Sequence, residues 1–433
     1  MTIAELFQLR KNDPRWNTSY PLDPSDWEDY RVPGSLPFEH DSRLSFYIHI
    51  PFCKQLCSFC EYTRMICPDE SVQREYLFAI AHDIKHFREK YPDITLLGFD
   101  IGGGTPTALS EKNFALLMQI YQTAISGLKM ADNYEPSLEG TFNTLSEQKL
   151  DDMAKMGIHR LSLGVQSSCN AVLSQHQRGN SSEAMMSSWL KKAWNKGVKK
   201  VNLDFMYGLK GQNESTIQQD LELIGRLQPQ QVTLYELRTN MISAEETFTK
   251  EELYAQYVHY FDGLLAMGYK SRFGQNTFSV DAADEGVSSY LRERMLNGAA
   301  YKGFGMAAQS MSSSGIAYNV GKLESVPQKE LRLEGYPELF TYLLPSNELA
   351  SKYMAISAYN GSFSINRLKD LGVSDNSLNE ILDFCMGKGL LYKGDSDRVF
   401  VSRKGFVHYG ALFSLFYPTQ FGQKASLIAL ERG

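Results

Sequence analysis

Two patterns of apolar residues alternate in the first half of the chain. From Ser45 to about Thr239, short apolar runs alternate with longer segments whose apolar residues recur every three or four positions, as on one face of a helix. The short runs predict strands at 46–51, 95–102, 137–141, 160–165, 200–207 and 232–237. The longer segments predict helices at 72–91, 111–125, 146–155, 182–196 and 214–227.

Strands that alternate with helices indicate βαβ units, and therefore an α/β fold with a parallel sheet. Six such units favour an open (β/α)6 partial TIM barrel over a closed eight-stranded one. In either fold, ligands gather at the carboxyl ends of the strands. The segments that directly follow the predicted strands are therefore the first place to look for a functional site.

The pattern changes after Met241. Residues 248–267 predict a long helix, and the run 303–309 predicts a strand-to-helix element or a loop. Further helices at 348–359, 365–370 and 376–388 precede a hairpin at 391–402. We therefore expect an N-terminal arm (1–44), a barrel (45–241), an accessory region that completes the active site (242–346) and a mostly helical, winged-helix-like C-terminal lid (347–433).

Composition excludes several classes of protein. The 433 residues carry a formal net charge of −6 with mixed signs, which argues against a nucleic-acid-binding surface, and the lid helices show no dense basic stripe. The N-terminus is too polar for a signal peptide, and no apolar run approaches the ~18 residues that span a bilayer. Six cysteines with three in one loop are not a disulfide framework. We expect a cytoplasmic protein without a membrane or nucleic-acid partner.

Three cysteines follow the first predicted strand. Cys53, Cys57 and Cys60 are spaced C-x3-C-x2-C. A structural zinc site takes four N or S ligands, whereas three thiolates on a 4Fe–4S cluster leave one iron open to a small molecule. The alternatives are a zinc knot, in which Cys67 supplies a fourth ligand, or three unrelated thiols.

A glycine run follows the second predicted strand, as Gly102-Gly-Gly-Thr-Pro-Thr107. Three residues without a Cβ let a ligand approach the backbone closely. They also expose amide N–H groups that can hold a carboxylate. Gly-rich turns between strand and helix are common, so this run is weak evidence when taken alone.

Taken together, the motifs resemble the oxygen-independent coproporphyrinogen III oxidase (HemN-like) family of radical S-adenosylmethionine (SAM) proteins. The matching segments are Tyr47-Ile-His-Ile-Pro-Phe-Cys-x3-Cys-x2-Cys60, the glycine run, Arg160-Leu-Ser-Leu-Gly-Val-Gln166, Gln177-Arg178, Asp204-Phe-Met-Tyr-Gly-Leu209 and Gly303-Phe-Gly305. Their order and spacing also match. The resemblance implies an enzyme that cleaves SAM to a 5′-deoxyadenosyl radical, which abstracts hydrogen from a substrate.

The resemblance also implies roles for individual residues. Cys53, Cys57 and Cys60 would ligate the 4Fe–4S cluster, and SAM would chelate its fourth iron. The residues that match SAM-contacting positions of the family are Gly103, Gly104, Thr105, Glu139, Gln166, Arg178 and Asp204. Among them, Glu139 would pair with the SAM ammonium or ribose, Arg178 with its carboxylate and Asp204 with the ribose hydroxyls.

Simpler interpretations of these residues stay open. Glu139 is alternatively a solvated carboxylate at a strand end, and Arg178 an ordinary surface cation. Asp204 lies inside an apolar strand, where a buried carboxylate needs a partner. His49 is most simply a packed core residue, with direct cluster ligation as its alternative.

A second SAM molecule is part of the leading hypothesis. It would lie between Tyr47, the strand end that carries Glu236 and Arg238, and the loop from Gly303 to Gly305. The glycines would permit close backbone approach, and Arg238 would pair with a carboxylate. Tyr47 would pack against adenine or a second ligand. A mutual salt bridge is the plain alternative for Glu236 and Arg238.

Departures from the family pattern bear on the reaction. Coproporphyrinogen dehydrogenases continue past the third cysteine with Gly-Cys-Asn, whereas this chain has Glu61-Tyr-Thr-Arg64. The leading hypothesis is class C methyl or methylene transfer to an unsaturated ring, such as a tetrapyrrole or an aromatic metabolite. The alternatives are oxidative decarboxylation of coproporphyrinogen III propionates and a heme chaperone. The expected partners are a small-molecule substrate and a reduced flavodoxin or ferredoxin-type electron donor.

Overall fold

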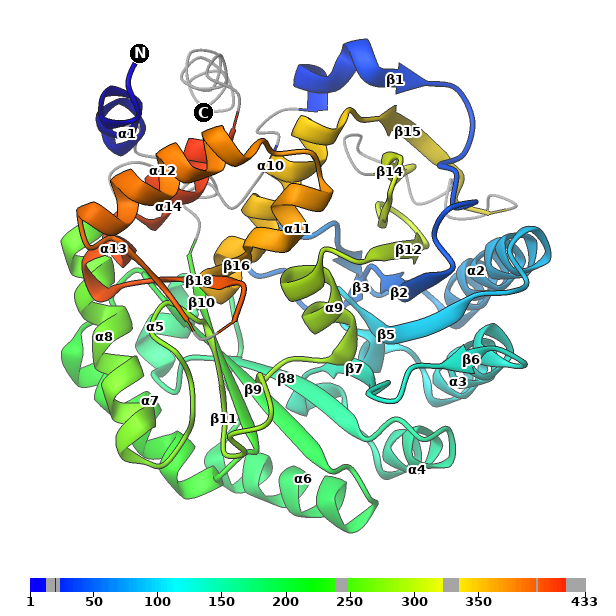
Figure 1. Ribbon diagram of the computed structural model, residues 1–433. Helices are drawn as coiled ribbons and strands as arrows, with labels where there is room; N and C mark the ends of the chain where they lie inside the picture. Colours follow the sequence, from blue (N-terminus) through cyan, green and yellow to red (C-terminus); the bar gives the residue numbers. More distant parts are fainter. Residues whose placement is uncertain (13–19, 21–23, 238–247, 322–334, 395, 418–433) are drawn as a thin grey trace.

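A computed structural model gives the fold, and it describes residues 1–12, 20, 24–237, 248–321, 335–394 and 396–417. Arg238 and residues 13–19 and 21–23 of the predicted arm lie outside these residues. Thirteen strands of the described part form one continuous sheet, around which the helices are arranged (Figure 1). No described helix is both long and apolar enough to cross a membrane.

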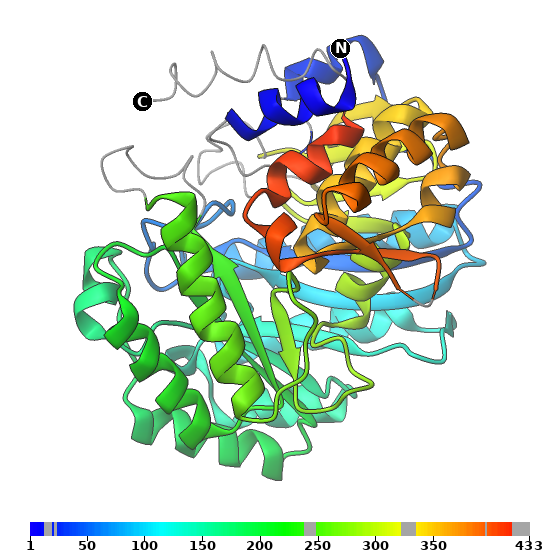
Figure 2. The ribbon, with the colours of Figure 1, turned by 60° about the vertical axis from the view of Figure 1, so that its left-hand side comes forward.

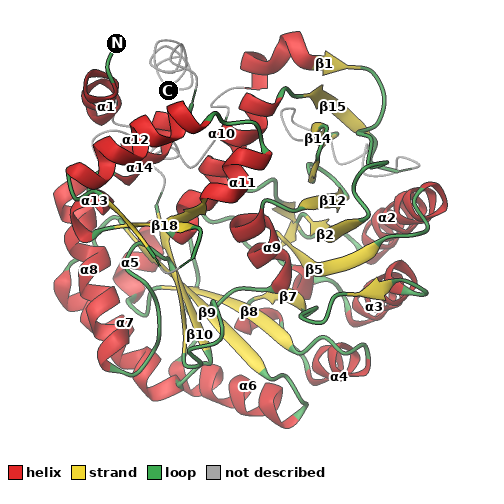
Figure 3. Cartoon of the chain, in the orientation of Figure 1, coloured by secondary structure: helices red, strands yellow, loops and turns green. Residues whose placement is uncertain are grey.

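Six parallel strands form the barrel wall, as the sequence predicts. In sheet order they are β2 (Arg43–Ile50), β5 (Thr95–Gly103), β7 (Pro136–Gly140), β8 (Arg160–Gln166), β9 (Lys200–Tyr207) and β10 (Gln231–Glu236). A short strand, β6 (Lys129–Met130), pairs beside β5, and β11 (Thr277–Ser279) closes the far edge in the antiparallel sense. Figure 3 shows these strands with the helices outside them.

The crossover helices confirm the periodicity of the sequence. They are α2 (Glu70–Lys90), α3 (Glu111–Ile125), α4 (Glu147–Lys155), α6 (Glu183–Asn195) and α7 (Glu214–Leu227). Four of them begin at a side-chain cap, because Ser110, Ser146, Ser182 and Asn213 each accept a hydrogen bond from the backbone N–H three residues later. The short α5 (Asn170–Gln175) was not predicted from the sequence.

The region after the barrel extends the same sheet. The strand β12 (Ala300–Phe304) pairs in parallel with β2 and so continues the barrel wall beyond its first strand. The antiparallel strands β13 (Gln309–Ser312), β14 (Gly315–Asn319), β15 (Glu338–Leu343) and β1 (Arg31–Val32) follow it. The run 303–309, expected to be a strand-to-helix element or a loop, is thus the end of one strand, a turn and the start of the next.

One of the remaining helices, α8 (Lys250–Ala266), packs beside α7 on the outside of the barrel (Figure 1). The others are α1 (Ile3–Asn12), α9 (Ser289–Asn297), α10 (Ser346–Ser357), α11 (Ile365–Asp370), α12 (Asp375–Gly387), α13 (Arg403–Phe406) and α14 (Tyr409–Phe413). The predicted hairpin is β17 (Leu391–Lys393) with β18 (Arg398–Val401), and β16 (Ser362–Ser364) pairs with it. Five 3-10 turns complete the described elements: η1 (Pro24–Tyr30), η2 (Pro106–Ala108), η3 (Phe142–Thr144), η7 (Ala358–Asn360) and η8 (Ser414–Phe416).

The N-terminal arm packs on the C-terminal helices. Helix α1 contacts α12 and α14, and Figure 2 shows it beside them above the barrel. The Tyr20 hydroxyl and the Trp27 indole both donate to the buried carboxylate of Glu348, the indole at 2.9 Å. The two ends of the described chain therefore form one layer over one side of the sheet.

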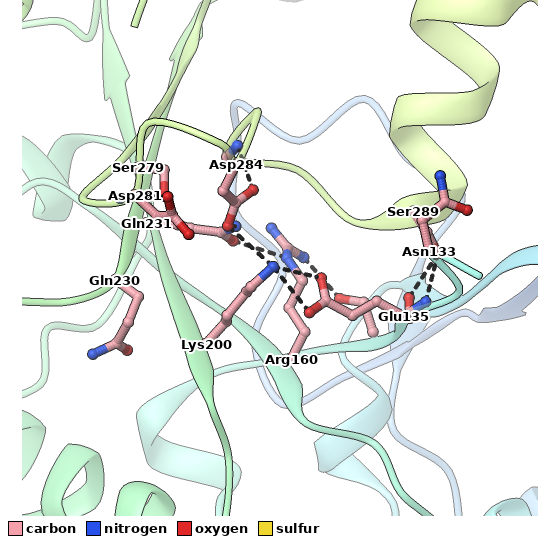
Figure 4. A network of polar contacts seen from close by, with 12 residues as sticks. Asn133, Glu135, Arg160, Lys200, Gln230, Gln231, Ser279, Asp281, Asp284 and Ser289 are labelled. Carbon is pink, nitrogen blue, oxygen red and sulfur yellow. Dashed lines mark hydrogen bonds and ion pairs between the residues drawn. The ribbon is translucent and has the colours of Figure 1, made fainter. Parts of the chain in front are cut away.

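A polar network closes the amino-terminal end of the barrel. The Arg160 guanidinium donates to Gln231 at 2.9 Å and to Ser137 at 2.7 Å. Beside it, Lys200 forms ion pairs with Glu135 at 3.0 Å and with Asp284 at 3.1 Å (Figure 4). Charged and amide side chains fill this end of the barrel, so the floor of the barrel interior is polar.

Candidate functional site

The cysteine loop is held in a defined conformation. The strand β3 (Phe52–Cys53) pairs with β4 (Met65–Ile66) and closes the base of the loop. At its tip, the Ser58 N–H donates to the His176 carbonyl at 3.1 Å, and the Gly179 N–H donates to Gln55 at 3.0 Å. The loop therefore has anchors on both β2 and the segment after α5.

Two arginines flank the three thiols. Arg64 donates to the Cys57 carbonyl at 2.6 Å, and Arg178 approaches the Cys57 Sγ at 3.6 Å. Cys53 and Cys57 are buried and Cys60 is half-buried. Burial raises the pKa of the Cys53 and Cys60 thiols, while the nearby Arg64 charge opposes that rise. The positive groups favour the thiolate form that binds metal.

Cys67 faces a different part of the molecule. Its Sγ lies 3.5 Å from the Ala108 carbonyl oxygen and accepts a hydrogen bond from Gln73 at 3.3 Å. Both partners lie at the start of the neighbouring helices and outside the cysteine loop. The geometry therefore favours the three-cysteine interpretation over a four-ligand zinc knot.

The donor set fits a cluster better than a single ion. Within the described residues, no three His, Cys, Asp or Glu side chains converge on one point where a metal ion would sit. In a 4Fe–4S cluster each thiolate binds a different iron, so its ligands surround a volume instead. Cys53, Cys57 and Cys60 lie in one loop, whose base is closed by the pairing of β3 with β4, and they match this requirement.

Each glycine of the run 102–104 makes room for a different neighbour. A Cβ on Gly102 would lie 2.6 Å from the Glu139 carboxylate, and one on Gly103 would lie 2.6 Å from the His49 ring. A Cβ on Gly104 would meet the Pro51 carbonyl oxygen at 2.9 Å and the Cys53 Sγ at 3.0 Å. Thr105 donates to the same Sγ at 3.5 Å. The glycine run therefore packs directly against the cysteine loop.

We expect Gly104→Ala to impair cluster loading. The added methyl collides with backbone at Pro51, which cannot rotate away, so overpacking should cost about 1–3 kcal/mol and displace Cys53. Iron and sulfide per protein after anaerobic reconstitution measure the effect. Gly387→Ala is the matched control, because nothing lies within 4 Å of its Cβ position. Equal cluster content in the two variants would contradict the packing argument.

Two carboxylates project into the barrel above its floor. Glu139 accepts the Gly103 N–H at 3.1 Å, and Asp204 accepts from Ser162 at 3.1 Å and from Asn202 at 2.7 Å. Burial raises the pKa of Glu139 to about 8, and the Asp204 charge adds to that rise. Burial also raises the pKa of Asp204 to about 6. Each carboxylate is therefore available to pair with a cation or a hydroxyl group of a ligand.

Gln166 ends β8 in an unusual conformation. Its φ is +73°, and its side-chain Oε1 is buried without a hydrogen-bond partner. The following residues are held in place by the buried Asp220, which accepts from Ser167 and from the backbone and side chain of Ser168. Left-handed backbone at a non-glycine residue persists only where its surroundings impose it, commonly at ligand sites.

Arg178 lies in a pocket beside the cysteine loop. Its Nη2 donates to the Gly164 carbonyl, and its Nε is buried without a partner. The pocket is also lined by Cys57, Thr105 and Asn143. Arg178 is therefore no solvated surface cation, since its charge points into a cavity at the carboxyl ends of the barrel strands.

Tyr47 and His49 line the opposite side of the loop. The Tyr47 ring stacks on Tyr290 with centroids 5.6 Å apart, and its hydroxyl lies 3.4 Å from the His49 Nδ1. The other His49 nitrogen, Nε2, lies 2.8 Å from the Thr63 carbonyl oxygen. His49 therefore supports the loop through a hydrogen bond, as expected for a packed core histidine.

The structure brings together only part of the predicted second SAM site, because Tyr47 and Gly303 are register partners on β2 and β12. Glu236 accepts from the Tyr207 hydroxyl at 3.0 Å, and strand alternation puts it on the face opposite Tyr235 and Asp204. Arg238 lies outside the described residues. A Cβ on Gly303 would lie 2.3 Å from the Gln309 carbonyl oxygen, and one on Gly305, whose φ is +92°, would lie 2.5 Å from the Tyr76 hydroxyl. Internal packing alone therefore requires both glycines.

Sequence reasoning missed several polar residues of the barrel interior. The Oδ2 atom of Asp100 accepts a hydrogen bond from the Ser288 hydroxyl at 2.6 Å, and its Oδ1 atom is buried without a hydrogen-bond partner. Arg160 and Arg294 also face inward from the barrel and from α9. The alternation of inward and outward side chains along β5 and β8 would have identified Asp100 and Arg160, because a charged residue at an inward position of a buried strand needs a partner.

The family comparison matches the barrel. Residues 47–224 match the family model described as the radical SAM superfamily. The heme chaperone HemW of Bacillus subtilis (strain 168) is 30% identical over 193 residues, which cover 45% of this chain and 50% of the relative. The oxygen-independent coproporphyrinogen III oxidase of Escherichia coli (strain K12) is 28% identical over 236 residues, 54% of this chain and 50% of the relative. The chain thus spans about half the length of these curated relatives.

A solved structure extends the fold similarity beyond the barrel. Coproporphyrinogen III oxidase (HemN) from Escherichia coli, described as a radical SAM enzyme, superimposes with a TM-score of 0.70 and 21% identity. The match covers 87% of this chain and 90% of that one. At this identity the similarity establishes the fold, which includes the strands and helices after the barrel.

Proposed function

We propose that this chain reductively cleaves SAM and abstracts hydrogen from a small-molecule substrate, because residues 47–224 match the radical SAM superfamily and the relatives include HemW and oxygen-independent coproporphyrinogen III oxidase. The observation that carries the proposal is the convergence of three thiols, Arg178 and the Glu139–Gly103 contact at the carboxyl ends of adjacent parallel strands. A 4Fe–4S cluster held by Cys53, Cys57 and Cys60 would supply the electron that breaks the S–C5′ bond of SAM.

The residues of the chain have separable roles in this proposal. Glu139 would hold the SAM ammonium and Arg178 its carboxylate, each through a charge-assisted hydrogen bond. Asp204 would bind the ribose hydroxyls. Gln166 offers an unpaired buried oxygen to the same ligand. The network around Arg160 and Lys200 would exclude water from below, which protects a reactive carbon radical.

We further propose that the reaction is carbon transfer to an unsaturated ring, with a tetrapyrrole as the first candidate. Relatives named for coproporphyrinogen oxidation and for heme both point to tetrapyrroles as the substrate class. The Glu61-Tyr-Thr-Arg64 run replaces the Gly-Cys-Asn of the dehydrogenases, and in the structure it supplies Arg64 to the cysteine loop. Oxidative decarboxylation and heme carriage are the rival functions.

The remaining expectations belong to the same proposal. A second SAM would donate the carbon, and a reduced flavodoxin or ferredoxin would supply electrons in the cytoplasm. The contacts of α1 with α12 and α14 support a lid assembled from the N-terminal arm and the C-terminal domain, with the four-part division described above.

Product analysis tests the proposal. Anaerobically reconstituted protein is incubated with SAM, dithionite and a panel of tetrapyrroles, and small products are measured by mass spectrometry. We expect 5′-deoxyadenosine together with S-adenosylhomocysteine in proportion to a methylated ring. Carbon dioxide without S-adenosylhomocysteine would favour the decarboxylase, and the absence of deoxyadenosine under every condition would contradict radical SAM activity itself.

A further inference from the structure

Arg294 is a half-buried cation with no carboxylate partner among the described residues. Its Nη2 donates to the Gln309 Oε1 at 3.2 Å, and its Nη1 lies 3.4 Å from the Tyr290 hydroxyl. Its Nε is buried without a hydrogen-bond partner. A guanidinium that is partly removed from water without a counter-ion carries a desolvation cost, which a bound anion reduces.

The side chain that accepts a hydrogen bond from Arg294 is the neutral amide of Gln309, whereas a carboxylate at this position would complete an ion pair. The Gln309 Oε1 accepts from Arg294 and also from the Tyr301 hydroxyl. A glutamate has the same length and would accept the same two bonds, and it would also neutralise the guanidinium. Because the chain has an amide here, the positive charge of Arg294 remains available to a ligand.

Arg294 lies against aromatic rings that continue to the cysteine loop. Its guanidinium carbon is 4.7 Å from the Tyr301 centroid, and Tyr301 meets Tyr290 edge-to-face at 5.8 Å. Tyr290 in turn stacks on Tyr47. In the sheet, Tyr47 is the register partner of Asp100 on β5, and His49, two residues further along β2, packs beside Gly103, whose N–H donates to Glu139. This aromatic wall therefore borders the part of the barrel that carries Glu139.

Tyr47 joins the aromatic wall to the cysteine loop. Its hydroxyl lies 3.4 Å from the His49 Nδ1, and the His49 Nε2 lies 2.8 Å from the carbonyl oxygen of Thr63 in that loop. Arg294 on α9 is therefore connected through Tyr301, Tyr290 and Tyr47 to the loop that is proposed to hold the cluster. The guanidinium suits a carboxylate with its paired donors.

We propose that Arg294 binds a carboxylate of the substrate and so selects an acidic ring compound. The inference rests on the proposed function, because it takes the barrel to be the substrate site. It adds the residue that distinguishes an acidic side chain from its neutral ester.

The test compares an acid with its ester on cluster-loaded protein. Coproporphyrin III and its tetramethyl ester are titrated in the same buffer, and binding is followed by the porphyrin absorbance without reductant or turnover. Wild-type protein should bind the acid about tenfold to a hundredfold more tightly, which is the effect of one charge-assisted hydrogen bond. Arg294→Gln should lose this preference, and Arg294→Lys should keep part of it.

Two further variants keep the test decisive. Arg292→Gln, on the same helix, removes a cation that already pairs with Glu293 at 3.2 Å, and it should retain the preference. Gln309→Glu leaves Arg294 in place but gives it an internal partner, so it should lose the preference even if Arg294→Gln folds poorly. Melting curves verify that each variant is folded.

Several outcomes would overturn the inference. They are equal affinity of wild type for acid and ester, an unchanged preference in folded Arg294→Gln or Gln309→Glu, and an equal loss in Arg292→Gln. If Arg294→Gln bound less SAM per protein but kept its preference for the acid, the guanidinium would be assigned to SAM instead. The proposed function fails separately, through the absence of deoxyadenosine from wild-type protein, because the titration requires no SAM cleavage.

Discussion

Replacement of Cys57 by alanine is expected to abolish cluster assembly and, with it, all SAM cleavage. Cys57 is buried between Arg64 and Arg178 at the centre of the loop, and no other described thiol can take its place without moving the backbone. Three thiolates are the minimum for an open-iron cluster. Iron content, the visible absorbance near the iron–sulfur charge-transfer bands, and deoxyadenosine after reduction provide three independent measurements.

Cys67→Ala is the matched control for this prediction. Its Sγ contacts Gln73 and Ala108 instead of the loop interior, so the variant should load iron and cleave SAM as the wild type does. Cys53→Ala and Cys60→Ala should behave like Cys57→Ala. Cluster loss in Cys67→Ala as complete as in Cys57→Ala would contradict the three-cysteine site and restore the four-ligand alternative.

Glu139→Gln is expected to lower SAM affinity about tenfold to a hundredfold, as the loss of a bond to a charged group predicts. The amide can still accept the Gly103 N–H, so the glycine run should keep its conformation, but it cannot neutralise an ammonium. Equilibrium dialysis of the cluster-loaded protein measures the affinity. Glu147→Gln, on the exposed surface of α4, is the control and should bind SAM normally.

The same carboxylate predicts a pH dependence of SAM binding. Burial raises the pKa of Glu139 to about 8, with Asp204 and Asp100 adding to the rise and Arg160 opposing it. At pH 7 the ligand-free group is therefore largely protonated, and binding of the SAM ammonium must release that proton. Affinity should increase as the pH rises from about 6 to 8. In Glu139→Gln the increase should be much smaller, and an unchanged slope would exclude the pairing.

The structure changes how a second SAM site can be tested. A bulky residue at position 305 would collide with the Tyr76 hydroxyl and lie 2.8 Å from the His49 carbonyl oxygen. The change would disturb β2 just before the cysteine loop, so it cannot separate carbon transfer from SAM cleavage. The ratio of S-adenosylhomocysteine to deoxyadenosine in wild-type protein is the better measurement.

The sequence by itself determined the barrel and the cysteine loop. Apolar runs of strand length and amphipathic helical segments are local properties, and the six parallel strands and five crossover helices follow them within a few residues. The cysteine spacing and the glycine run also belong to short contiguous segments. Their meeting at one end of the sheet follows from the rule that parallel strands present their carboxyl ends together.

Only the tertiary structure decided which side chains face one another across the barrel. The pairing of β12 with β2 joins residues more than 250 positions apart, and no local pattern marks such a partner. The β12–β13 pairing brings Gln309 to Arg294, and packing against β13, α2 and β2 requires the glycines at 303 and 305. Likewise, Asp220 supports the loop after Gln166 from a helix more than 50 residues away. Hydrogen bonding and desolvation depend on these distant neighbours, so the roles of buried polar residues emerge only once the chain is folded.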